Sequence, residues 1–139
     1  MRELSSGQKA KKTGQWAKIM AKWLITYSSK GKPWKIVSFE GKEGGESRGI
    51  VDFIAIRRNH KFSNEKLKAG DIFEIILIQA KGGTASFPTD EEISRLIEVK
   101  NYYHAKHIVL ANWKKREKLN FYYLINRNWK EGDAKEIFK

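Results

Sequence analysis

The longest mainly apolar segment of this chain, residues 72–81 with the sequence IFEIILIQAK, limits the folds that the chain can adopt. A strand with nearly continuous Ile and Leu is typically buried on both faces, because other elements cover both sides of its sheet. We therefore expect a central strand here, inside a layered α/β domain. The run contains Glu74 and is too short to cross a bilayer as a helix.

Two amphipathic helices are predicted. The first covers residues 8–27, where six apolar side chains recur at helical spacing and are expected to face the core: Trp16, Ile19, Met20, Trp23, Leu24 and Tyr27. The second covers residues 90–104 and begins with a capping box formed by Thr89 and Glu92. Its inward side chains are expected to be Ile93, Leu96, Ile97 and either Tyr102 or Tyr103.

Five strands are predicted, at residues 34–40, 48–56, 72–81, 107–113 and 120–126. The polar residues 57–71 are expected to form an exposed connection, and the polar segment from Arg127 onward has three apolar anchors: Trp129, Ile137 and Phe138. The first three strands can form a meander, and the second helix can carry a crossover to the fourth strand. The expected fold is one α/β domain, residues 1–139, with the element order α-β-β-β-α-β-β and a mixed central sheet flanked by helices.

The charge of the chain points to a polyanionic partner. There are 28 Lys and Arg against 16 Asp and Glu, the formal net charge is +12 and the pI is near 9.9. Nucleic acid is the commonest partner of so basic a domain, and a Lys-rich solvated surface is the alternative explanation. Cysteine is absent, which excludes disulfides and thiolate metal sites. No apolar segment of the signal-peptide type begins the chain, so a soluble, cytoplasmic protein without membrane association is expected.

Asp52 needs an explanation, because it lies between Val51 and Phe53 in an apolar predicted strand. A carboxylate in such a strand is costly unless something pairs with it. Gln79 and Lys81 lie two residues apart at the end of the next strand, so their side chains project from one face. A hairpin between the two strands would place Asp52 opposite that end. The pairing is either a structural salt bridge with Lys81 or part of a functional site.

The order of elements, the VD of residues 51–52 and the QAK of residues 79–81 together resemble the PD-(D/E)xK nuclease superfamily, which has the restriction-endonuclease-like fold. The Gln-x-Lys form is similar to that of Mrr-like restriction endonucleases, and the basic surface is similar to that of archaeal Holliday junction resolvases. The resemblance implies that Asp52, Gln79 and the Ala80 backbone carbonyl bind Mg²⁺ or Mn²⁺. It also implies that Lys81 helps to activate water and stabilises charge on the phosphate. Oxygen ligands of this kind suit such an ion.

The chain departs from this family pattern at two places. Val51 replaces the proline before the aspartate, and Gln15 or Lys18 lies about where many relatives have a glutamate on the first helix. Glu46 is the first candidate for the missing carboxylate, and Glu40 is the second. Two glutamines in place of acids would weaken the binding of Mg²⁺.

Phosphate contacts are expected from Arg48, beside Glu46, and from two basic connections that contain Arg57, Arg58, Lys61, Lys114 and Lys115. The first of these connections is expected to lie beside the site as part of a DNA groove, and plain solvated loops are the alternative. The three histidines, His60, His104 and His107, are irregularly spaced and are not expected to bind zinc.

The expected function is metal-dependent endonucleolytic hydrolysis of DNA phosphodiester bonds, with DNA favoured over RNA and a homodimer as one arrangement. The alternative is a non-catalytic nucleic-acid-binding module on the same fold, because the two glutamines leave few carboxylates to hold a metal. A third hypothesis is a structural subunit whose basic surface docks on an acidic protein.

Overall fold

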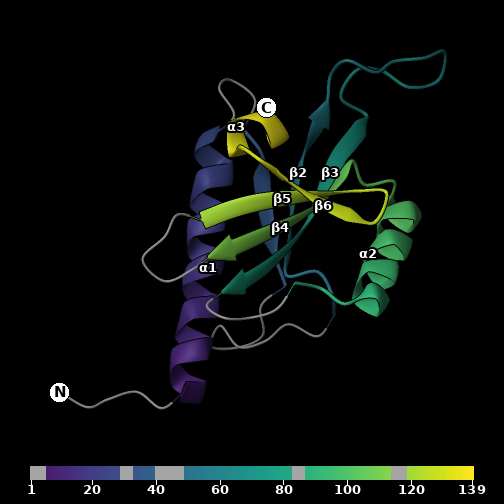
Figure 1. The fold of residues 1–139 in the computed structure, drawn as a ribbon. Helices are drawn as coiled ribbons and strands as arrows, with labels where there is room; N and C mark the ends of the chain where they lie inside the picture. The colour runs from purple at the N-terminus through teal and green to yellow at the C-terminus, as the bar shows by residue number, and fades with distance from the viewer. Residues whose placement is uncertain (1–5, 29–32, 40–48, 83–86, 114–118) are drawn as a thin grey trace.

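A six-stranded mixed sheet forms the centre of the molecule, with helices on both of its faces (Figure 1). The computed structural model describes residues 6–28, 33–39, 49–82, 87–113 and 119–139, and for residues 6–15 it describes the helical backbone. The helices are α1 (Ser6–Ser28), α2 (Asp90–Tyr103) and α3 (Ala134–Ile137). The strands are β1 (Lys35–Ser38), β2 (Phe53–Asn59), β3 (Ile72–Gly82), β4 (His107–Trp113), β5 (Leu119–Ile125) and β6 (Asn128–Gly132). None of the described helices is long and apolar enough to cross a membrane.

The strands lie in the sheet in chain order. The first three form an antiparallel meander, α2 carries the crossover from β3 to its parallel neighbour β4, and the last three are again antiparallel. The predicted α/β class, the mixed sheet and the order of elements through β5 are confirmed. The predicted central strand is also confirmed, because β3 is an interior strand and residues 76–79 are buried.

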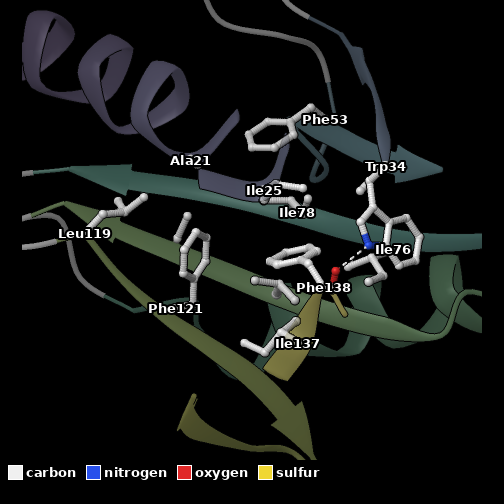
Figure 2. Packing of buried hydrophobic residues seen from close by; sticks show 13 residues of the cluster. Ala21, Ile25, Trp34, Phe53, Ile76, Ile78, Leu119, Phe121, Ile137 and Phe138 are labelled. Carbon is white, nitrogen blue, oxygen red and sulfur yellow. Dashed lines mark hydrogen bonds between the residues drawn. The ribbon is translucent and has the colours of Figure 1, made fainter. Parts of the chain in front are cut away.

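Two apolar clusters hold the layers together, one on each face of the sheet. The larger joins Ile25 of α1 to Ile76 and Ile78 of β3 and to Phe138 beside α3 (Figure 2). In the same cluster, the Trp34 Nε1–H donates a hydrogen bond to the Phe138 carbonyl at 2.8 Å, which ties the C-terminal end of the chain to the start of β1. The smaller cluster packs Leu96 of α2 against the opposite face. The two long helices therefore cover opposite faces.

The predicted first helix is confirmed, and Met20 and Leu24 pack against the core as predicted, but the inward placement of the other four residues is wrong. Its outward ridge carries the large residues, which are between 48% and 70% exposed: Trp16, Ile19, Trp23 and Tyr27. Small and aliphatic residues face the sheet and are fully buried: Ala17, Ala21 and Ile25. Alanines let the helix axis approach the strands closely, so the larger side chains at helical spacing lie on the other side of the helix.

The capping box of α2 is confirmed. The Thr89 hydroxyl accepts the Glu92 N–H and the Glu92 carboxylate accepts the Thr89 N–H, both at 3.2 Å. The buried side chains include Ile93 and Leu96, as predicted. The inward placement of Tyr102 or Tyr103 is wrong, because both rings are exposed and pack on each other in the last turn, with ring centroids 4.8 Å apart.

The second strand is shifted from its predicted position of 48–56. Residues 49–52 precede β2, and residues 57–59, which were expected to form an exposed connection, belong to it. The polar extension is stable in the sheet because Arg57 pairs across the strands with Glu74, with Nε and Oε2 2.7 Å apart. The basic connection therefore begins after Asn59.

The strand β6 and the helix α3, which follow β5, were not predicted from the sequence. Asn126 and Arg127 both have positive φ, 48° and 66°, and form the turn of the β5–β6 hairpin. Turns of this kind usually carry glycine at the second position, so Asn-Arg gives a weak sequence signal. The predicted anchors Ile137 and Phe138 are buried in the larger cluster.

Candidate functional site

Asp52 lies one residue before β2, where the ladder between β2 and β3 ends. Its backbone is fixed on both sides, because its N–H donates to the Ile78 carbonyl (3.0 Å) and its carbonyl accepts the Phe39 N–H (3.1 Å). Its carboxylate accepts the Ala80 N–H through Oδ2 at 2.7 Å. The Asp52 side chain thus accepts the hydrogen bond that a backbone carbonyl would accept if the β2–β3 ladder continued. This bond holds the carboxylate against residues 79–81.

The Ala80 carbonyl faces the same side of β3 as the Ala80 N–H. In a strand, the N–H and C=O of one residue point toward the same neighbouring strand, and those of the next residue point the other way. Since the Ala80 N–H points at Asp52, the Ala80 carbonyl also points toward the end of β2. One carboxylate and one backbone carbonyl therefore share a corner of the sheet. We call Asp52 with residues 79–81 the Asp52 corner.

Lys18 of α1 approaches the Asp52 corner from the face that α1 covers. Its Nζ lies 4.0 Å from Asp52 Oδ1, and the two side chains are 13% and 17% exposed. A cation at this distance offsets part of the carboxylate charge, and partial burial reduces the screening by water. The sequence placed either Gln15 or Lys18 near this point. The structure brings Lys18 there, and the side chain of Gln15 lies outside the described residues.

Gln79 and Lys81 leave β3 on the opposite face, the one covered by α2. Leu77, two residues earlier, belongs to the cluster with Leu96, and alternate strand residues share a face. Gln79 is 6% exposed, and its Oε1 is buried without a hydrogen-bond partner in the described part of the chain. A buried polar atom left without a partner costs about 1–3 kcal/mol. This oxygen would therefore be stabilised by a donor or a cation.

Lys81 lies close enough to the start of α2 to act on Glu92. The pKa of Glu92 is below its ordinary value of 4.5, first because its carboxylate accepts the Thr89 N–H. The positive charge of Lys81 also lowers this pKa, while partial burial opposes the shift. The Lys81 side chain therefore adds positive charge within electrostatic range of the start of α2.

Asn112 is a residue that the sequence analysis missed. It lies beside Lys81 in the parallel register of β3 and β4, so the two side chains share the α2 face. Asn112 is 3% exposed, and its Oδ1, like Gln79 Oε1, is buried without a hydrogen-bond partner in the described residues. An asparagine at the end of a strand rich in apolar residues is the signal in the sequence. Its register with Lys81 appears only in the folded sheet.

Several predicted site residues lie outside the described residues: Glu40, Glu46, Arg48, Lys114 and Lys115. The carboxylate that would complete the site is therefore not placed. Within the described residues, no group of three or more His, Cys, Asp or Glu side chains is arranged to hold a metal ion.

The remaining predicted phosphate contacts lie at the far end of β2 from Asp52. Arg58 follows Asp52 by six residues, which corresponds to about 20 Å along a strand. Arg57 is bonded to Glu74 and stacks on Trp34, with its guanidinium carbon 4.0 Å from the ring centroid. Arg58 and Lys61 are exposed. The expectation that this basic segment lies beside the Asp52 corner is wrong, because β2 separates the two.

The Asp52 corner has the donor types that a hard divalent cation prefers, namely a carboxylate, a backbone carbonyl and an amide oxygen. Gln79 Oε1, which is buried without a hydrogen-bond partner among the described residues, is an oxygen of the type that such an ion binds. The hydrogen bond from Ala80 and the ammonium of Lys18 already use part of the Asp52 carboxylate. The residues therefore fit a weakly bound Mg²⁺ or Mn²⁺ more closely than a tightly bound one.

Comparison of the chain with protein-family models, with curated proteins and with solved structures finds no match.

Proposed function

We propose that this protein is a metal-dependent endonuclease that hydrolyses DNA phosphodiester bonds at the Asp52 corner. The observation that carries the proposal is the 2.7 Å hydrogen bond from the Ala80 N–H to Asp52, which places the carboxylate against the Gln79–Ala80–Lys81 backbone. The meander, the crossover helix and the order of the strands support a restriction-endonuclease-like fold, in which an aspartate and an x-Lys strand end occupy corresponding places. The net charge of +12 supports a polyanionic substrate.

The proposed metal ligands are the Asp52 carboxylate, the Ala80 carbonyl and Gln79 Oε1, with Glu46 or Glu40 as a further carboxylate. When bound, Mg²⁺ or Mn²⁺ would neutralise phosphate charge and make water a better nucleophile. Asp52 contributes the negative charge of the site, and its fixed backbone keeps its carboxylate in place. Lys81 contributes an ammonium that stabilises negative charge on the phosphate and orients the attacking water.

The experiment that tests this proposal is a cleavage assay on supercoiled plasmid DNA and on branched DNA, with Mg²⁺, with Mn²⁺ and with EDTA. The expected result is divalent-dependent nicking that is lost in Lys81→Met and in Asp52→Asn. Lys130→Met is the matched control, because Lys130 is an exposed lysine on β6, at the edge of the sheet farthest from β1. The proposal fails if the wild-type protein cleaves neither DNA with either ion.

A second candidate is a nucleic-acid-binding module without catalysis. The observation that favours it is the position of Lys18, whose ammonium lies 4.0 Å from Asp52 Oδ1, where it neutralises charge that would otherwise attract a metal ion. DNA binding that falls steeply with salt and is unchanged by EDTA, in a protein that does not cleave, would select this function. Cleavage that appears in Gln79→Glu would identify the site as a decayed nuclease.

A further inference from the structure

A pocket of about 430 Å³ lies at the far end of the sheet from the Asp52 corner. Its polar lining is basic: Lys35, Arg57, Arg58 and His60. None of the described residues that line it is acidic. We call it the Arg58 pocket. Its volume lies within the range of roughly 300–1,000 Å³ that is usual for sites binding small organic ligands.

The pairing of β1, β2 and β3 places four side chains that line the Arg58 pocket on one face of the sheet. Lys35 of β1 is the partner of Ile56, and Arg58 of β2 is the partner of Phe73. Cross-strand partners and residues two apart point to the same face, so these four side chains share it. This face is also the one that α2 covers. Because α2 packs against β4, it leaves Phe73 51% exposed. The pocket is therefore built on rigid strands and is open to solvent.

The two kinds of surface in this pocket suit the two parts of a nucleotide. Arg57 is neutralised by Glu74, so Lys35 and Arg58 supply the positive charge that remains for an anion. Pro33, Ile56 and the Phe73 ring supply an apolar surface beside it. An inorganic anion would satisfy the charges but leave the apolar surface exposed. A phosphate attached to a flat base would satisfy both.

Local contacts hold Arg58 and His60 in position. The Arg58 Nη1–H donates to the Gly70 carbonyl at 3.2 Å, and its guanidinium carbon lies 5.7 Å from the centroid of the Phe73 ring. Gly70 has φ +94°, and a side chain there would approach the His60 ring to 3.1 Å. The glycine therefore lets the β2–β3 connection close tightly around the edge of the pocket.

We propose that the Arg58 pocket binds a nucleotide unit, with the phosphate at Lys35 and Arg58 and the base against Phe73. The unit comes either from a free mononucleotide or from one position of a single strand, because both present the same phosphate and base. This proposal does not depend on cleavage at the Asp52 corner. It adds a binding site about 20 Å away, with β2 between the two.

The test is fluorescence anisotropy of a labelled single-stranded oligothymidylate in EDTA, so that binding is measured without cleavage. Phe73→Leu is expected to weaken binding at least about fivefold, and Phe73→Tyr to retain it, as stacking predicts. Lys35→Gln and Arg58→Gln are each expected to reduce the slope of log K against log salt by about 0.7, the value for one single-strand phosphate. Lys130→Gln is the matched control, because Lys130 is exposed on β6, at the other edge of the sheet.

Competition separates the two sources of the nucleotide. Thymidine monophosphate that displaces the strand from wild type, and does so less well from Phe73→Leu, identifies a mononucleotide site. Displacement by unlabelled strand alone identifies a site for one position within a strand. The proposal is overturned if Phe73→Leu binds like wild type, or if Lys35→Gln and Arg58→Gln change the salt slope no more than Lys130→Gln. Circular dichroism of each variant checks that it is folded.

Discussion

At the scale of the residue, Asp52 is held by a backbone amide as well as by a lysine. The Ala80 N–H and the Lys18 ammonium approach different oxygens of its carboxylate. The sequence identified Asp52 as a residue in need of a partner, and it indicated Lys81 and a divalent cation as the candidates. In the structure, the Ala80 N–H donates to this carboxylate and the Lys18 ammonium lies beside it, while the charge of Lys81 lowers the pKa of Glu92 at the start of α2.

Two substitutions of Asp52 are expected to distinguish how much its hydrogen bond and its charge each contribute to stability. Asp52→Ala leaves the Ala80 N–H without its acceptor and is expected to lower the free energy of unfolding by about 1–3 kcal/mol. Asp52→Asn keeps an acceptor oxygen for that N–H and loses the negative charge that attracts Lys18, so it is expected to cost less. Urea denaturation of the two variants measures the difference. Equal losses in both would mean that the hydrogen bond does not stabilise the corner.

His107 makes the stability of the fold dependent on pH. Its pKa lies below the ordinary value of 6.5, first because the ring is partly buried at the start of β4, and then because Lys106 and Lys100 repel its protonated form. The unfolded chain therefore binds this proton more tightly than the folded one. The contribution of neutral His107 to the free energy of unfolding is fully present above pH 6.5. It is lost as the pH falls from 6.5 through the lower pKa of the folded state.

The variant His107→Gln removes this titration. Urea denaturation at about pH 8 and about pH 5.5 is expected to show that wild type loses more unfolding free energy than the variant as the pH falls. Carboxylates titrate in both proteins, so the comparison isolates the histidine. Equal losses in the two proteins would contradict this assignment.

At the scale of the element, α1 shows how far periodicity predicts structure. The spacing of its apolar residues correctly predicted a helix, but the largest side chains were taken for the buried ones. Alanines at positions 17 and 21 are buried because the helix lies close to the sheet, and that distance is set by packing rather than by the helix sequence. In the same way, the pairing of Arg57 with Glu74 extends β2 into a segment whose polarity indicated a loop.

The buried and exposed sides of α1 are expected to respond differently to mutation. Ala21→Leu forces a larger side chain against the sheet and is expected to lower the free energy of unfolding by about 1–3 kcal/mol. Trp23→Gln, on the outward ridge, is expected to change it by less than about 0.5 kcal/mol. Thermal or urea denaturation compares the two. A larger loss in Trp23→Gln would mean that the aromatic ridge of α1 is covered in solution.

At the scale of the whole molecule, the sequence predicted one end of the sheet better than the other. The meander follows from chain order, so Asp52 and residues 79–81 could be placed together from the sequence. The position of Asn112 depends on the register across the β3–α2–β4 crossover, which no local pattern specifies. The Arg58 pocket depends on three strands and their pairing, so the sequence predicted phosphate contacts from Arg57 and Arg58 but not the pocket that they line together with Lys35.

Mn²⁺ binding to the purified protein, monitored by electron paramagnetic resonance, is the sharpest test of a metal site at the Asp52 corner. Wild type is expected to bind Mn²⁺ weakly, and Asp52→Asn is expected to abolish this binding. Tighter binding is expected in Lys18→Met, because the cation beside Asp52 is removed, and in Gln79→Glu, because a carboxylate replaces an amide. Mn²⁺ binding that none of these three substitutions changes, or its absence from all four proteins, would contradict a metal site at the Asp52 corner.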